Sequence, residues 1–264
     1  MRAVRWIVAS VLVAGLLAAV AAAQSAPPTV AVTAGRGVIT AQPAGPIASG
    51  PTRLQFTRTG SGDVEAYVAS LRAGVSVEQL RRVITSDASI GLVYLEASAT
   101  LSSAAPKRAL TVDLRPSVTY VLVSQVGNRY ALTELATTGT ANGARAPSAD
   151  ARISMVDYAF RGAATLPRNG RIQVDNAGSA FHFAIAFPIR PGTRGRAIGR
   201  AFRSGGERAI GRVATGPPVT VQNVLSPTTT NLQEVTFPRA GRYTLVCFFG
   251  GHNRFGMYRT VRVR

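Results

Sequence analysis

The chain contains an internal repeat, and this feature constrains the fold more than any other. The segment QFTRTGSGDVEAYVASLRAG, from Gln55, aligns without a gap with QVDNAGSAFHFAIAFPIRPG, from Gln173. Further on, LRPSVTYVLVSQVGN aligns with FPRAGRYTLVCFFGG. The aligned pairs include Gly60 with Gly178, Ser61 with Ser179, Tyr120 with Tyr243 and Leu122 with Leu245. A repeat on this scale predicts two tandem copies of one domain.

Short β-prone runs, most of them separated by Gly or Pro, fill the second copy. They are Arg152–Tyr158, Arg171–Asp175, His182–Phe187, Val219–Val224, Gln233–Phe237, Tyr243–Phe248 and Met257–Arg262. Such runs in about 110 residues predict an all-β, Greek-key β-sandwich. In the first copy, Val75–Ile84 has helical spacing instead. Its counterpart, GTRGRAIGRAFRSGGERAIGR, reads as a short basic helix or a loop, and its glycines favour the loop.

The repeat and the composition divide the chain into four parts. We expect a signal peptide over residues 1–23, a first domain over 24–135, a linker over 136–150 and a second domain over 151–264. The linker assignment rests on the polar, low-complexity segment ATTGTANGARAPSAD.

The N-terminus is typical of a secretory signal peptide. Arg2 and Arg5 precede an apolar run from Trp6 to Val20, and three alanines end the segment before Gln24. An uncleaved anchor helix is the alternative, although the run is short for a membrane span. The rest of the chain has no second run of that kind, so we expect an exported protein (periplasmic, cell-envelope or extracellular) without a transmembrane span in its mature form.

Positive charge is concentrated in the second copy. The whole chain carries a formal net charge of +18. Residues 151–264 hold seventeen arginines and four acidic residues, a net +13, whereas residues 24–135 carry a net +3. This predicts attraction to an acidic redox protein or to an anionic envelope polymer or lipid, unless it reflects only an arginine-rich composition. Nucleic acid is not an expected partner, because no reading motif accompanies the charge.

Metal-ligating residues are scarce, and most of them lie in one short segment. Cys247 is the only cysteine, His252 and His182 are the only histidines, and Cys247, His252 and Met257 follow one another in a C-x4-H-x4-M pattern. Two imidazoles, one thiolate and a distant thioether form the donor set of an electron-transfer copper site. A lone buried cysteine, two structural histidines and a core methionine are the alternative interpretation.

The second copy resembles the cupredoxin family of small blue copper proteins. The resemblance rests on an N-x-G segment before His182, the strand pattern G-x-Y-x-L-x-C, the C-x4-H-x4-M loop and a final strand. It covers residues 150–264, and reaches residues 28–135 only through the repeat. It implies one copper ion per chain, with His182 and His252 as imidazole ligands, Cys247 as the thiolate and Met257 as the long axial ligand.

The sequence departs from the family pattern in two respects. The family commonly has polar residues after the first histidine and after the cysteine, which hydrogen-bond to each other, whereas this chain has Phe183 and Phe248. If the sandwich placed them side by side, an aromatic contact would replace that hydrogen bond. The first copy also lacks the ligands: the positions aligned with the four ligands hold Val64, Ser124, Arg129 and Glu134. We therefore expect a metal-free first domain.

These features favour an exported electron carrier with one type 1 copper site and no catalytic activity. Multicopper oxidases, copper nitrite reductases and zinc hydrolases need more histidines than this chain has, and binuclear copper centres need a second cysteine. The alternatives are a copper-binding or delivery protein that exchanges its metal, and a metal-free envelope module that binds through its basic face.

Overall fold

The computed structural model describes residues 25–61, 64–84, 95–103, 107–127 and 129–264. The expected signal peptide, residues 1–23, lies outside the described residues. Among the helices of the described part, none is long and apolar enough to cross a membrane.

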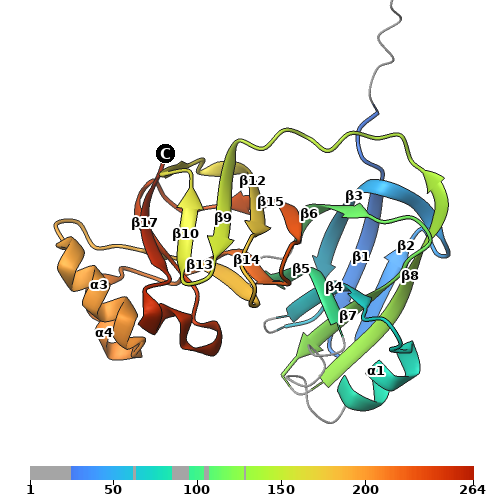
Figure 1. Cartoon of the computed structure of the whole chain (residues 1–264), viewed down its shortest axis with the longest axis horizontal. Coiled ribbons are helices and arrows are strands. Elements are labelled where there is room, and N and C mark those ends of the chain that lie inside the picture. Colours follow the sequence, from blue (N-terminus) through green and yellow to red (C-terminus); the bar gives the residue numbers. More distant parts are fainter. Residues whose placement is uncertain (1–24, 62–63, 85–94, 104–106, 128) are drawn as a thin grey trace, which may run out of the picture.

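The fold is all-β and consists of two β-sandwich halves arranged in tandem (Figure 1). The strands of the first half are β1 (Thr29–Gly35), β2 (Val38–Gln42), β3 (Ile47–Arg58), β4 (Val64–Leu71), β5 (Leu95–Ser103), β6 (Lys107–Leu114), β7 (Thr119–Val126) and β8 (Arg129–Ala141). Those of the second half are β9 (Ala151–Val156), β10 (Ala159–Gly162), β11 (Thr165–Leu166), β12 (Asn169–Asn176), β13 (His182–Pro188), β14 (Val219–Leu225), β15 (Thr230–Thr236), β16 (Gly241–Val246) and β17 (Tyr258–Val263). Each strand expected in the second copy overlaps an observed one, and the short strands β10 and β11 are additional.

The strand pairings of the two halves agree under the sequence alignment. In the first half, Val68 on β4 pairs with Leu122 on β7. In the second half the aligned residues, Ala186 on β13 and Leu245 on β16, are also paired. Both halves begin in a similar way: β1 pairs antiparallel with β2 and parallel with β3, and β9 pairs antiparallel with β10 and parallel with β12.

One sheet runs through both halves. Strand β15 pairs with β6 through Leu232 and Gln233, and this joins four strands of the second half to the first. The other layer of the second half is a separate five-stranded sheet in the order β11-β17-β16-β13-β14. Alternating residues of the two layers pack against each other in the core, as the burial patterns of β9 and β13 show.

The expected linker begins too early. Strand β8 continues through Ala141, and Ala136 at the proposed boundary pairs with Thr119. Pairing of Thr137 with Ile47 and of Ala141 with Ser49 on β3 keeps this end of β8 in the sheet despite its polar composition. Only residues 142–150 cross between the halves without regular structure (Figure 1).

Helix α1 (Val77–Ile84) lies where helical spacing predicts it. It begins with a capping box, because the Gln79 amide donates to Ser76 Oγ and the Ser76 amide donates to Gln79 Oε1. Leu80 and Ile84 form its buried face.

The arginine-rich segment forms two helices, so the loop that its glycines favoured is wrong. Helices α3 (Gly195–Ser204) and α4 (Glu207–Val213) lie at one end of the molecule (Figure 1). Ile198, Phe202 and Ile210 are buried beneath them, and this apolar stripe outweighs the low helix propensity of glycine. A Cβ on Gly199 would lie 3.0 Å from Tyr258 Oη, so this glycine permits close packing on β17.

Candidate metal centre

The four expected ligands come from three neighbouring segments at one end of the five-stranded sheet. His182 is the first residue of β13, and Cys247 directly follows β16, the strand paired with β13. His252 lies in the 3-10 segment η2 (Phe249–Phe255), and Met257 directly precedes β17. Antiparallel pairing therefore brings together residues that are 65 positions apart in the sequence.

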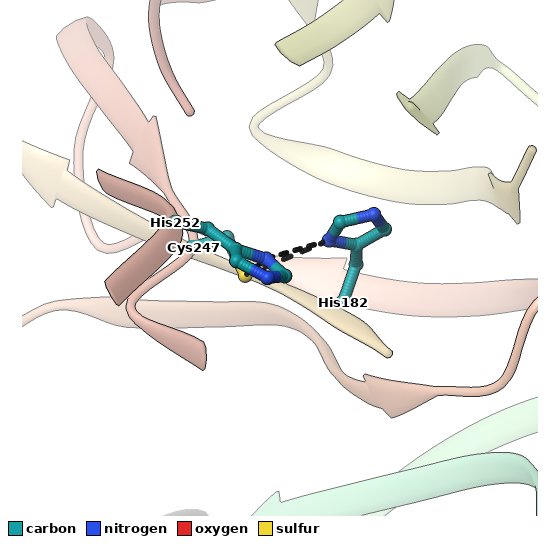
Figure 2. Close-up of side chains that lie close together, drawn as sticks. All are labelled: His182, Cys247 and His252. Carbon is teal, nitrogen blue, oxygen red and sulfur yellow. Dashed lines mark hydrogen bonds between the residues drawn. The ribbon is translucent and has the colours of Figure 1, made fainter. Parts of the chain in front are cut away.

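Three donor atoms of these residues form a compact, buried triangle (Figure 2). His182 Nδ1 lies 3.1 Å from His252 Nδ1, and Cys247 Sγ lies 4.0 Å and 3.7 Å from these two nitrogens. His182 and Cys247 are fully buried, and His252 is 7% exposed. The three residues are the one cluster of metal-ligating side chains of this kind found among the described residues.

The triangle has the dimensions of a metal site. In zinc sites the ion lies about 2.0 Å from nitrogen ligands and about 2.3 Å from sulfur ligands. Three donors spaced evenly in one plane at these distances would lie about 3.5 Å apart (nitrogen to nitrogen) and about 3.7 Å apart (nitrogen to sulfur). The observed separations lie within about 0.4 Å of these values. A donor set of two imidazoles and one thiolate, with a thioether near by, is consistent with a single copper ion.

Met257 is buried beside this triangle. Its side chain is fully buried and belongs to the same core cluster as Cys247. Its backbone is tied to two of the proposed ligands, because its amide donates to the His252 carbonyl at 3.1 Å and its carbonyl accepts from the Cys247 amide at 3.1 Å. The loop from Cys247 to Met257 is thus closed by its own hydrogen bonds.

The Cys247 sulfur is surrounded by apolar side chains and backbone donors. Burial raises the pKa of this thiol, since a low-dielectric environment disfavours the thiolate. Backbone N–H groups of Phe183 and Phe249 hydrogen-bond to the sulfur and oppose this effect. A bound cation would favour the thiolate outright, as coordination does for cysteine.

Both histidines favour their neutral form. Burial lowers the pKa of His182, although its contact with Asp157 opposes the shift. Burial also lowers the pKa of His252, and the neighbouring His182 lowers it further. A neutral imidazole has a free lone pair on one nitrogen, and this neutral form is the one that binds a metal ion.

Asp157 contacts a candidate ligand and was not identified by sequence reasoning. Its Oδ1 lies 3.1 Å from His182 Nε2. Hydrogen bonds from the side chain and amide of Ser179 lower the pKa of Asp157. Asp157 is therefore a carboxylate, and it accepts a hydrogen bond from the Nε2–H group of His182. The Nδ1 lone pair of His182 is then directed toward His252 and Cys247. A carboxylate that orients a metal-binding histidine is a common second layer of metal sites. The signal in the sequence was weak: Asp157 is one of only four acidic residues in residues 151–264.

Phe183 and Phe248 do not lie side by side, so no aromatic contact between them takes the place of the hydrogen bond of the family pattern. Phe183 packs against the central core that contains Cys247. Phe248 packs in the cluster beneath α3 and α4, where its ring centroid lies 6.2 Å from that of Phe187. Phe248 begins the loop from Cys247 to Met257 (the ligand loop) and has helical backbone angles, φ −97° and ψ −4°. Phe183, in contrast, lies within the extended strand β13.

The ligand loop is hydrogen-bonded to helix α3. Gly250 and Gly251 adopt positive φ angles of 54° and 80°, which glycine reaches without strain. Asn253 is buried, and its Nδ2 donates to the Phe202 carbonyl of α3 at 2.8 Å. The conformation of the loop that contains His252 therefore depends on α3.

No protein-family model matches the chain, and no curated protein matches its sequence. Several solved structures share similarity with its fold. Auracyanin B is 19% identical, with 46% of this chain and 93% of that protein covered, at a TM-score of 0.30. Auracyanin A, a "blue" copper protein from Chloroflexus aurantiacus, is 20% identical, with 43% and 96% covered, at a TM-score of 0.27. The copper nitrite reductase from Nitrosomonas europaea is 10% identical, with 89% and 94% covered, at a TM-score of 0.28. These TM-scores are low, so the assignment of the site rests on the geometry of the chain itself.

Proposed function

We propose that this protein is an exported one-electron carrier with a single type 1 copper site. His182, Cys247, His252 and Met257 would hold the ion, with two imidazoles, a thiolate and a weakly binding thioether as donors. The observation that carries the proposal is the buried triangle of Nδ1, Nδ1 and Sγ atoms with separations of 3.1 to 4.0 Å. It contains every histidine and cysteine of the chain.

The chemistry of such a donor set supports electron transfer. A bound copper ion supplies the change between Cu(I) and Cu(II), and two imidazoles with a thiolate suit both states. The residues of the chain keep these donors in place in either state, because His182 and Cys247 sit at the ends of paired strands. Burial of the proposed ligands excludes water and favours a retained ion over one that is delivered elsewhere.

Electrons would enter and leave near His252. Its ring contacts Tyr158, which in turn packs against Phe255. These two side chains are 47% and 68% exposed, so the ligand lies close to an exposed aromatic surface. Exposed arginines lie on α3 and α4 and directly before α3. Helix α3 is hydrogen-bonded to the ligand loop through Asn253. These arginines are Arg194, Arg196, Arg200, Arg203, Arg208 and Arg212. An acidic redox protein is the partner that this surface favours, because opposite charge speeds encounter.

The proposal is tested by the visible absorption spectrum of the mature protein after addition of Cu(II), beside that of Cys247→Ser. We expect one copper per chain and an intense thiolate-to-copper band near roughly 600 nm, as is typical of a trigonal His2Cys site. The serine variant should lack this band. A colourless wild-type protein without bound copper would contradict the proposal and leave the basic surface as the basis of function. Bound copper without a reversible potential would favour the delivery alternative.

A further inference from the structure

The turn between β9 and β10 contacts both imidazoles of the proposed site. Val156 pairs with Ala159, so the turn consists of two residues, Asp157 and Tyr158. Asp157 contacts His182, and Tyr158 contacts His252. Asp157 contacts Nε2 of His182, whereas Nδ1 of the same ring faces Cys247.

Asp157 is itself fixed on both carboxylate oxygens. The Ser179 amide lies 3.0 Å from Oδ1 and from Oδ2, and the Ser179 hydroxyl donates to Oδ2 at 2.6 Å. Gly178 leaves the space that this arrangement needs: a Cβ there would lie 2.4 Å from Asp157 Oδ1 and 2.7 Å from His182 Nε2. The carboxylate therefore has one position, and in that position it accepts a hydrogen bond from His182 Nε2 at 3.1 Å.

Tyr158 holds a backbone conformation that is costly for its residue type. Its φ is +64°, in the left-handed region that residues other than glycine, asparagine and aspartate rarely adopt. The corresponding turn of the first half, Arg36-Gly37 between Gly35 and Val38, has glycine at this place with φ +73°. Strain that persists where glycine would remove it points to a function of the side chain.

The tyrosine side chain supplies a contact that glycine cannot. Its ring centroid lies 5.3 Å from that of His252 at an interplanar angle of 82°, and 5.0 Å from that of Phe255. An edge-to-face contact of this kind restricts rotation of the imidazole. His252 also lies 5.9 Å from Phe249, so the ring is held between two aromatic side chains.

We propose that the Asp157-Tyr158 turn positions both histidine ligands, with Asp157 setting the tautomer and direction of His182 and Tyr158 the ring orientation of His252. This proposal rests on the copper-binding function proposed above. Asp157 and Tyr158 are positioning residues that touch the ligands and not the ion. The carboxylate also places a negative charge beside the site, which favours Cu(II) over Cu(I).

Two substitutions of Asp157 separate orientation from charge. In Asp157→Ala, both are lost, and we expect affinity for Cu(II) to fall about 10- to 100-fold, as for other residues behind metal ligands. Asp157→Asn retains an oxygen acceptor and removes the charge. We expect about a tenfold loss of Cu(II) affinity relative to Cu(I), which is a reduction potential about 59 mV more positive. Wild-type affinity and potential in both variants would overturn the role of Asp157.

The test of Tyr158 uses the residue found in the first half. Tyr158→Gly removes the ring and relieves the backbone, so the metal-free protein should unfold at a denaturant concentration close to that of wild type. We expect several-fold weaker Cu(II) binding and an altered charge-transfer band. Ser117→Gly is the matched control: Ser117 has φ +56° in the first half, far from the site, and its variant should keep the wild-type spectrum. An unchanged spectrum and affinity in Tyr158→Gly would overturn the role of Tyr158.

These measurements distinguish failure of this proposal from failure of the proposed function. If wild type binds no copper, the electron-transfer function fails. If wild type shows the band and the three variants at Asp157 and Tyr158 match it in affinity, spectrum and potential, only the positioning role fails.

Discussion

The two halves share strand pairings but differ in what they place at the end of the sheet. The second half has Cys247 after β16, where the first half has Ser124 on β7. Ser124 is fully buried, and its hydroxyl lies 3.2 Å from the Gly35 carbonyl and 3.0 Å from the Val38 carbonyl. The same position thus serves hydrogen bonding in one half and a proposed metal ligand in the other.

The charges around this position also differ between the two halves. The turn residue that corresponds to Asp157 is Arg36, and the position aligned with His252 holds Arg129. Both arginines are exposed and line one surface hollow together with Gly60 and Ser61, the residues aligned with Gly178 and Ser179. Two guanidinium groups repel a cation, so this end of the first half is unsuited to a metal ion. The comparison teaches that similar strand pairings form with and without the four candidate ligands, which lie at strand ends and in the loop between them.

The largest expected effect comes from exchanging one residue between the halves. His252→Arg places the residue of the first half in the ligand loop, and the loss of a ligand together with the added charge should abolish the thiolate-to-copper band. The reverse change, Arg129→His, should create no copper site, because Val64, Ser124 and Glu134 occupy the other positions. Copper content and absorption of the two variants check this, and a second bound copper ion per chain in Arg129→His would contradict the comparison.

The aligned glycines should respond differently to alanine. In Gly178→Ala the new methyl group would lie 2.4 Å from Asp157 Oδ1, so we expect about 1–3 kcal/mol of destabilisation and about tenfold weaker Cu(II) binding. In Gly60→Ala the new methyl group would meet no atom of the described residues within 4 Å, but the φ of +78° costs alanine about 1–2 kcal/mol. Unfolding should therefore detect both substitutions, whereas a copper titration should detect only Gly178→Ala. Equal copper affinities would mean that Gly178 has a purely structural role.

The smallest effect is expected at the boundary between the halves. Arg53 on β3 forms a two-point ion pair with Glu234 on β15, with Nε to Oε1 and Nη2 to Oε2 both 2.8 Å apart. The side chains are 32% and 40% exposed, so solvent screens the pair and we expect a coupling of about 0.5–1 kcal/mol. A double-mutant cycle with Arg53→Ala and Glu234→Ala measures this term. The copper spectrum should not change in any of these variants, since the pair lies outside the site.

Much of the fold was predictable because local patterns decide it. Short β-prone runs between glycine and proline residues predicted each main strand of the second half, and helical spacing predicted the helix that ends at Ile84. The repeat also aligns residues that pair between β4 and β7 with residues that pair between β13 and β16. The helices α3 and α4 did not, since the stripe of Ile198, Phe202 and Ile210 matters only when a core lies beneath it.

By itself, the sequence determined the candidate donors, because a chain with one cysteine and two histidines offers few ways to bind a soft metal ion. It also determined which half could hold them. Only the tertiary structure decided what surrounds them: Asp157 behind His182, Tyr158 beside His252, and Phe183 and Phe248 in separate clusters. The reason is physical. Ligand identity is a property of single residues at fixed spacing, whereas orientation and solvent exclusion come from side chains that meet only when the strands pair.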